Sequence, residues 1–221
     1  MTIPDTHLHT HPHQLQASDI RQLYDSEVGT AYVNSAFFRE RLMRASKMRR
    51  LIFAKAQGDI LDVACGSGEN FAYYNRPGNH YTGIEISPVM AERARERARN
   101  LDMNVDVQVM DAQQLEFPDH SFDTVVSALA TCTFPDQIAA LKEMKRVCKS
   151  GGRILLFEHG RSRIEFIGRW QDRVAPQEYA TGGCRFNQKP EEVVKAAGLK
   201  IVWSKQALLG IVIVMEIDPS L

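Results

Sequence analysis

The sequence predicts an α/β protein built on a seven-stranded, mostly parallel sheet, with helices on both faces and an antiparallel last strand. Short apolar runs alternate with segments of helical periodicity through most of the chain. A turn of small residues, 65–68, connects the first apolar run directly to a helix-compatible segment. The last two runs, 200–203 and 209–217, follow each other with no helix between them. Alternating strands and helices favour parallel neighbours, and consecutive strands favour an antiparallel pair.

The first half of the predicted sheet consists of strands that end in polar or small residues. The run 59–63 leads into the glycine turn, 81–86 has an acid near its end, and 105–109 alternates apolar and polar residues. After the second strand, Ser87 supplies a hydroxyl cap and Pro88 a first-turn proline, so a helix is expected to begin there.

The second half continues the same alternation. The continuous apolar run 124–129 indicates a buried fourth strand. Asp136 caps the next helix, residues 153–159 form the fifth strand, and Pro190 opens the final helix. Between them, the segment 160–189 is less regular and is expected to be a loop-rich lid.

Composition fits an ordinary globular protein. The chain has 221 residues, of which 44% are hydrophobic, with 27 basic and 27 acidic side chains. Balanced charge gives no support for a nucleic-acid partner. No apolar run approaches the roughly 20 residues that span a bilayer, and no signal-peptide pattern begins the chain. The four cysteines show neither C-x-x-C nor metal-finger spacing, so reduced thiols, a cytoplasmic location and no metal site are expected.

Residues 1–17 are predicted to be a flexible, His-rich leader. His7, His9, His11 and His13 could hold a metal, but prolines and the lack of an apolar pattern favour the leader. Residues 18–221 are predicted to be one domain that starts with a helical lid at 18–57.

A basic amphipathic helix is predicted at 38–52. Its apolar stripe is flanked by arginine and lysine, with Glu40 as its one acid. Such a helix is either a solvated face packed on the sheet or a surface for transient contact with an anionic membrane. Both interpretations stay open, and the oligomeric state is not indicated.

The polar residues after the predicted strands point to a ligand. The carboxyl ends of parallel strands lie at one edge of a sheet, where Glu85, Asp111 and Ser127 join the glycine turn. Glu85 follows the turn by about 20 residues, where a carboxylate accepts ribose hydroxyls. Asp111 and Gln113 suit an adenine edge, and Asp62 could receive an ammonium. Since no Gly-Lys-Ser/Thr follows the turn, a P-loop is excluded, and these features together favour S-adenosylmethionine.

Five ordered motifs between about Tyr24 and Leu199 resemble the class I S-adenosylmethionine-dependent methyltransferases, in particular UbiE-like quinone methyltransferases of the type 11 domain family. They are residues 61–68, 83–90, 110–113, 121–123 and 141–152. The resemblance implies a Rossmann-like fold, S-adenosylmethionine as cofactor and S-adenosylhomocysteine as product. One departure is Ala64, where the family commonly has glycine. The cofactor-binding residues expected from the spacing and the resemblance are Tyr24, Asp62, Ala64, Cys65, Gly66, Gly68, Asn70, Glu85, Ile86, Met90, Asp111, Ala112, Gln113, Ser127 and Ala128.

The methyl acceptor is less well defined by the sequence. Residues 157–159 and 182–187 are similar to thiol S-methyltransferases and phospholipid N-methyltransferases, so the expected acceptor is a small molecule, with phosphatidylethanolamine at a membrane surface as the alternative. His159, with Glu158, is the candidate proton acceptor, although His159 could equally cap its strand. The lid 160–189 is the expected acceptor lid. Candidate acceptor-binding residues are Tyr32, Thr131, Trp170 and Asn187.

Other functions that could use a glycine turn are less well supported by the sequence. Ser127 to Ala130 stand where adenine-N6 and glutamine methyltransferases have an Asn/Asp-Pro-Pro motif, and the paired cysteines of arsenic methyltransferases are lacking. An NAD-dependent dehydrogenase would share the glycine turn and the acid, but this chain lacks its catalytic dyad. A noncatalytic S-adenosylmethionine sensor remains the alternative of another class.

Overall fold

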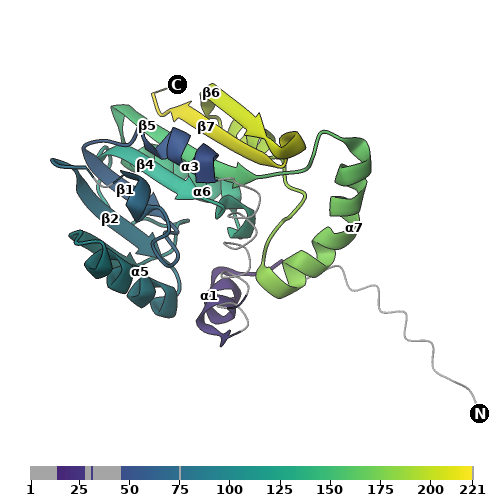
Figure 1. Cartoon of the computed structure of the whole chain (residues 1–221), viewed down its shortest axis with the longest axis horizontal. Helices are drawn as coiled ribbons and strands as arrows, with labels where there is room; N and C mark the ends of the chain where they lie inside the picture. The colour runs from purple at the N-terminus through teal and green to yellow at the C-terminus, as the bar shows by residue number, and fades with distance from the viewer. Residues whose placement is uncertain (1–13, 28–30, 32–45, 75, 221) are drawn as a thin grey trace, which may run out of the picture.

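The computed structural model describes residues 14–27, 31, 46–74 and 76–220 and centres on one seven-stranded sheet (Figure 1). The strand order is β3-β2-β1-β4-β5-β7-β6. The strands are β1 (Asp59–Val63), β2 (His80–Glu85), β3 (Val105–Val109), β4 (Phe122–Ala128), β5 (Cys148–His159), β6 (Lys200–Ala207) and β7 (Val212–Asp218). The fold class predicted from the sequence is confirmed.

Strand direction follows the connections. β1 pairs in parallel with β2 and β4, and the pairs β2–β3 and β4–β5 are also parallel. β7 lies antiparallel between β5 and β6, with Ile154 opposite Ile217 and Ile201 also opposite Ile217. A parallel return needs a long crossover, so the short link between β6 and β7 imposes the antiparallel pair. The predicted antiparallel last strand is therefore correct.

Helices cover both faces of the sheet and enclose two apolar clusters. One face is covered by α3 (Ser46–Phe53), α4 (Phe71–Tyr74) and α5 (Pro88–Asn100). The other is covered by α6 (Gln137–Val147) and α8 (Pro190–Ala196). Neighbouring residues of a central strand pack into opposite clusters. Val125 of β4 packs on the face covered by α6, and Val126 packs on the face covered by α3.

Local capping chemistry explains where two helices begin. The Ser87 hydroxyl accepts from the Met90 amide, with Pro88 in the first turn of α5. The Asp136 carboxylate accepts from the amides of Ile138 and Ala139 at the start of α6. Both predicted caps are confirmed, and they fix the turns that follow β2 and β4 on the cavity side of the sheet.

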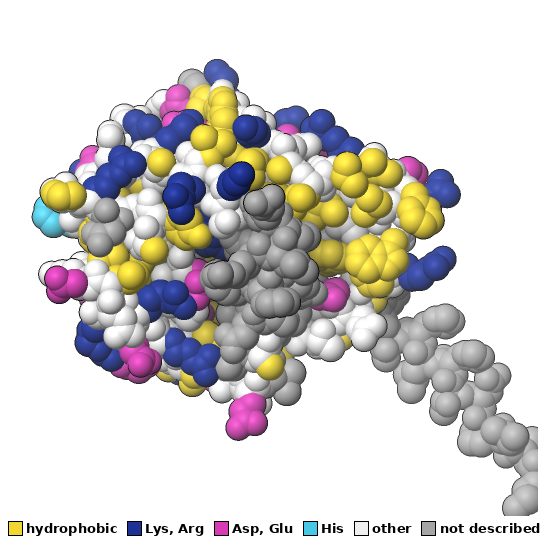
Figure 2. Space-filling view, viewed as in Figure 1, with side chains coloured by type: hydrophobic (Ala, Val, Ile, Leu, Met, Phe, Trp, Pro, Cys, Tyr) yellow, Lys and Arg dark blue, Asp and Glu magenta, His cyan; other side chains and the backbone are white. Residues whose placement is uncertain are grey.

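The segment 160–189 differs from the prediction of a loop-rich lid. It contains α7 (Glu165–Gly182), an 18-residue helix that holds Pro176 in its interior and ends at Gly183 with φ of 67°. α1 (Ala17–Asp25) lies close to the carboxyl-terminal part of α7, beyond one end of the sheet (Figure 1). On the face shown in Figure 2, hydrophobic side chains gather over α7, where Ile164, Phe166 and Trp170 are 45%, 84% and 54% exposed.

Some predictions concern residues outside the described part of the chain. These are the His-rich leader up to residue 13, Tyr32, and residues 38–45 of the basic helix. Among the described residues, no helix is both long and apolar enough to cross a membrane.

Candidate functional site

A cavity lies at the carboxyl ends of β1, β2, β3 and β4, beneath α1. This is the edge of the sheet at which the sequence predicted a ligand. Eleven of the predicted cofactor residues line it: Tyr24, Ala64, Cys65, Gly66, Asn70, Glu85, Ile86, Met90, Asp111, Ala112 and Ala128. The other four, Asp62, Gly68, Gln113 and Ser127, are not among the lining residues.

The turn after β1 brings bare backbone to the cavity. The Cys65 amide donates to the Ile84 carbonyl and the Gly68 amide to the Cys65 carbonyl, each at 2.9 Å. Gly66 has φ of 56°, and a Cβ added there would meet no atom within 4 Å, so space is open above its backbone. Gly68 has φ of 79° and lies against the Phe71 ring, 2.6 Å from where its Cβ would be. The two glycines therefore have different roles, one toward the cavity and one toward the core.

Ala64 adopts a left-handed backbone with φ of 54°, which favours glycine. It is the position at which the chain departs from the family motif, and it lines the cavity. Leu129, at the end of β4, lines the same cavity with φ of 53°. Left-handed non-glycine residues cost energy and cluster at functional sites. Both strained residues thus follow strands that end at the cavity.

Glu85 joins the end of β2 to the glycine turn. Its carboxylate accepts from the Gly66 amide and from the Ser87 amide, each at 3.0 Å. Only 6% of the residue is exposed, and this burial raises the pKa of Glu85 despite the backbone donors. A carboxylate offers about four acceptor positions, so the Glu85 carboxylate keeps acceptor capacity for a ligand hydroxyl.

Asp62 lies in a buried network rather than at the lip of the cavity. Its carboxylate accepts from Tyr74 Oη at 2.6 Å and from Asn70 Nδ2 at 3.0 and 3.1 Å. Burial raises the pKa of Asp62 to about 6. Asn70 Oδ1 in turn accepts from Arg49. The network therefore extends from the carboxylate to a cation, and both Asn70 and Arg49 line the cavity.

Arg49 was predicted on the basic face of the helix 38–52, but it is 4% exposed. Its guanidinium lies over the Phe157 ring, 4.8 Å from the centroid. A charged side chain buried on a cavity wall offers an anion a partner. Arginine in a helix pattern does not show which face is buried, so no signal in the sequence indicates this role.

Asp111 and Gln113 form the corner predicted after β3. Gln113 Nε2 donates to both Asp111 oxygens at 3.1 and 3.0 Å, and Gln113 Oε1 accepts from the Asp136 amide. Gln113 is thus occupied by protein partners, and Asp111 with Ala112 faces the cavity.

α1 closes one side of the cavity. Tyr24 donates its hydroxyl to the Gly182 carbonyl at 3.0 Å, and burial raises the pKa of Tyr24. Ser87 Oγ donates to Asp25 at 2.6 Å, which ties α1 to the start of α5. The helix predicted from the 18–24 pattern therefore bridges α5 and α7.

The residues predicted for the acceptor side lie next to this cavity. Glu158 is fully buried, accepts from the Thr131 amide at 3.3 Å, and has its pKa raised by burial to about 7. His159 Nε2 faces Cys184 Sγ at 3.2 Å. Neither Glu158 nor His159 lines the cavity. Their catalytic roles stay predictions.

Trp170 and Asn187 are held by protein partners. The Trp170 ring meets the Phe186 ring edge-on at 6.0 Å between centroids, and Asn187 donates to Asp172 at 2.9 Å.

Cavity residues that the sequence did not indicate are Ile20, Arg49, Ser67, Glu69, Ile84, Met110, Leu129, Ala130, Thr133, Phe134 and Pro135. Several belong to the loop after β4, whose path the strand pattern leaves undefined.

The chain is similar to known methyltransferases. Residues 61–156 match the family model described as a methyltransferase domain. The mitochondrial methyltransferase OMS1 of Saccharomyces cerevisiae is 29% identical over 214 residues, covering 89% of this chain and 45% of that protein. A phosphatidylethanolamine N-methyltransferase of Cereibacter sphaeroides is 35% identical over 104 residues, 46% of this chain and 51% of that protein. The chain therefore spans about half the length of these relatives.

Among solved structures, geranyl diphosphate C-methyltransferase from Streptomyces coelicolor, in complex with S-adenosyl-L-homocysteine, superposes with a TM-score of 0.65 at 16% identity. The superposition covers 79% of each chain. At this identity the likeness concerns the fold, and the sheet and its flanking helices are what the two chains share.

Proposed function

Because the chain carries a class I S-adenosylmethionine-dependent methyltransferase domain, we propose that it transfers the methyl group of S-adenosylmethionine to a small-molecule acceptor. The observation that carries the proposal is the contact between Glu85 and the glycine turn. A buried carboxylate, bonded to the Gly66 amide, lies beside backbone that no side chain covers. This combination suits a nucleoside with free ribose hydroxyls.

The lining residues fit the rest of the cofactor. Glu85 would accept from the ribose hydroxyls, and Asp111 with Ala112 would border the adenine. Arg49 would pair with the carboxylate of the methionine part, because it is the buried cation of this wall. Asp62 would act on the ammonium through Asn70, since its own oxygens are already bonded to Asn70 and Tyr74.

The reaction needs little chemistry from the side chains. The bound cofactor supplies an electrophilic methyl group, and an acceptor nucleophile displaces the sulfur in line. The rate of such a step is raised chiefly by holding the acceptor nucleophile in line with the methyl group and the sulfur. The strained loop at Leu129 and the wall at Thr133 to Pro135 would position the acceptor. A neutral acceptor also loses a proton, and His159 with Glu158 stays the predicted proton acceptor.

A methyl-transfer screen tests the proposal. The chain would be given S-adenosylmethionine with a tritiated methyl group and representative thiols, amines, phenols and phospholipids. The expected result is label in one acceptor class, lost in Glu85→Ala. Binding of S-adenosylmethionine without turnover in any class would instead favour the noncatalytic sensor.

A phospholipid amine is the second candidate acceptor, because α7 and its N-cap Ile164 present three large apolar side chains to solvent, Ile164, Phe166 and Trp170, and the Cereibacter relative is named for phosphatidylethanolamine. Exposed aromatic and aliphatic side chains suit the interface of a lipid surface. Phe166→Asp should then reduce methylation of phosphatidylethanolamine vesicles, while Val202→Asp on β6, 51% exposed, should not. Equal activity of both variants on vesicles would reject α7 as the contact.

The cytoplasm is the proposed location. In the described part of the chain no disulfide joins the four cysteines, which supports a reducing compartment.

A further inference from the structure

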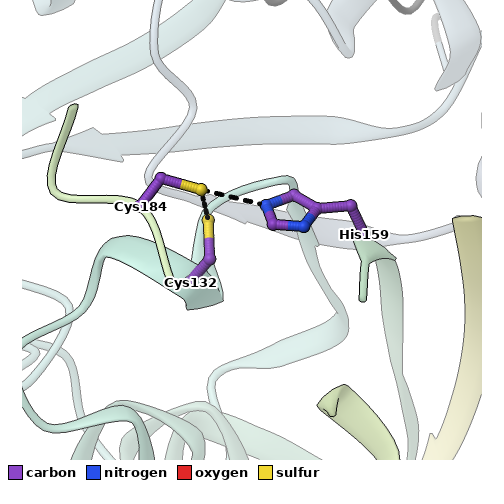
Figure 3. A group of neighbouring side chains, drawn as sticks. All are labelled: Cys132, His159 and Cys184. Atoms are coloured by element: carbon purple, nitrogen blue, oxygen red, sulfur yellow. Dashed lines mark hydrogen bonds between the residues drawn. The ribbon is translucent and has the colours of Figure 1, made fainter. Parts of the chain in front are cut away.

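Two buried cysteines and one histidine, from three separate segments, converge beside the cavity (Figure 3). Cys132 lies in the short helix η1 (Thr131–Thr133), His159 ends β5, and Cys184 follows α7. Cys184 Sγ lies 3.5 Å from Cys132 Sγ and 3.2 Å from His159 Nε2. One ligand atom from each of the three residues lies within 4.8 Å of the other two.

These separations are close to those of a tetrahedral metal centre. With Zn–S of about 2.3 Å and Zn–N of about 2.0 Å, tetrahedral ligands lie about 3.7 Å apart for two sulfurs and about 3.5 Å for sulfur and nitrogen. The two distances from Cys184 Sγ need shifts of a few tenths of an ångström, whereas the Cys132–His159 pair, within 4.8 Å, must close by up to about 1.3 Å to reach the tetrahedral separation. By contrast, a disulfide between Cys132 and Cys184 needs about 2.05 Å between the sulfurs, a much larger movement.

The ligands are held in place by the surrounding fold. The Cys132 carbonyl accepts from the Arg185 amide at 3.0 Å, which ties η1 to the residue after Cys184. The His159 ring packs against Phe186, with 5.6 Å between centroids. Cys132 and Cys184 are 1% and 4% exposed. A site of this kind is prearranged rather than assembled by exposed side chains.

The surroundings also favour a cation. Glu158 is fully buried, and its Oε2 has no hydrogen-bond partner among the described residues. This carboxylate interacts electrostatically with both Cys132 and His159. A buried acid with an unpartnered oxygen is costly unless a positive charge lies near it.

We propose that Cys132, His159 and Cys184 form a binding site for a soft divalent cation such as Zn²⁺, with a fourth coordination position open. Thiolate and imidazole ligands select such metals over Mg²⁺ or Ca²⁺. Binding replaces the two thiol protons: one Zn²⁺ is taken up, two S–H bonds break, two Zn–S bonds form, and two protons leave for solvent. The site goes beyond methyl transfer and does not depend on it, and while metal is bound through Nε2, His159 would not act as the proton acceptor of that reaction.

The position of the site gives it a direct consequence for the cavity. Cys132 stands next to Thr133, which lines the cavity, and Cys184 follows Gly183 at the end of α7. Metal binding would therefore fix the loop after β4, the end of β5 and the carboxyl-terminal end of α7 to one another.

Metal content of the purified chain tests the proposal. Because histidines in the leader could also bind metal, the test uses the full chain with His7, His9, His11 and His13 replaced by alanine. The expected result is one Zn²⁺ per chain after dialysis, with at least tenfold weaker binding in Cys132→Ala and Cys184→Ala. Cys148→Ala is the matched control, since Cys148 is equally buried but lies outside the cluster, and it should keep its metal.

A second measurement covers variants that fold poorly. Co²⁺ added to the metal-free parent protein should give a thiolate-to-metal charge-transfer band, and two protons should be released per metal bound. No retained Zn²⁺ together with no such band would overturn the proposal. Zn²⁺ binding unchanged in both cysteine variants, or a Cys132–Cys184 disulfide in place of metal, would do the same.

Discussion

Replacing Glu85 by alanine should have two effects: weaker binding of S-adenosylmethionine and a lower free energy of unfolding. Glu85 is 6% exposed and accepts from the amides of Gly66 and Ser87. A hydrogen bond to a charged acceptor contributes about 1.5–3 kcal/mol. Losing the acceptor for the ribose hydroxyls should therefore raise Kd by about tenfold to about a hundredfold. The two orphaned amides should lower the free energy of unfolding by about 2 kcal/mol or more.

The two effects can be separated by experiment. Isothermal titration of the folded variant gives the affinity, and urea unfolding gives the stability. Glu143→Ala is the matched control, because Glu143 accepts from the Leu115 amide at 2.8 Å but lies on α6, outside the cavity lining. It should lose stability and keep its Kd within about twofold, a change of about 0.4 kcal/mol. Unchanged affinity in Glu85→Ala would refute the assignment of the ribose site.

Three further predictions follow from the site. Ala64→Gly should raise the free energy of unfolding by about 0.5–1 kcal/mol, since it relieves about 1–2 kcal/mol of left-handed strain at an entropic cost of about 0.5–1 kcal/mol. A lower free energy of unfolding for the variant, measured by urea denaturation, would show that Ala64 is not strained. Arg49→Met should weaken S-adenosylmethionine about tenfold, or about 1.4 kcal/mol, and leave 5′-methylthioadenosine, which lacks the carboxylate, unaffected; equal losses for both would reject the pairing. The pKa of Asp62 is raised by burial to about 6 in the native state. Between about pH 4 and pH 6 the unfolded state has therefore lost the Asp62 proton, while the native state still holds it. As pH rises through this window, the free energy of unfolding should fall by up to about 3 kcal/mol relative to that of Asp62→Asn. Parallel curves of unfolding free energy against pH for the two proteins would contradict this.

Much of the cofactor side could be predicted because its signals are local. The glycine turn, Glu85 and Asp111 each follow a strand, and parallel strands bring their carboxyl ends together. The caps at Ser87 and Asp136 depend on residues within one turn, so they too could be read from the chain.

Other features depend on packing that a pattern does not contain. Asp62 is closed off by Tyr74, and Arg49 is buried although its helix looks uniformly basic. α7 lies in the segment 160–189 predicted to be irregular, and it holds Pro176 in its interior. Proline removes the bond to the carbonyl four residues earlier, and that carbonyl belongs to Asp172, which is exposed and can be hydrated.

The cluster of Cys132, His159 and Cys184 was also beyond the sequence. Its members are 27 and 25 residues apart in the chain, as 159 − 132 and 184 − 159 give, so no metal-binding spacing appears. Only the meeting of η1, β5 and the end of α7 brings them together.

The cavity is proposed to hold S-adenosylmethionine. Parallel isothermal titrations of the unmodified chain with S-adenosylmethionine and with NAD test it most directly, since both ligands carry an adenosine. We expect micromolar binding of S-adenosylmethionine at one site per chain and no binding of NAD. Micromolar binding of NAD without binding of S-adenosylmethionine would contradict it.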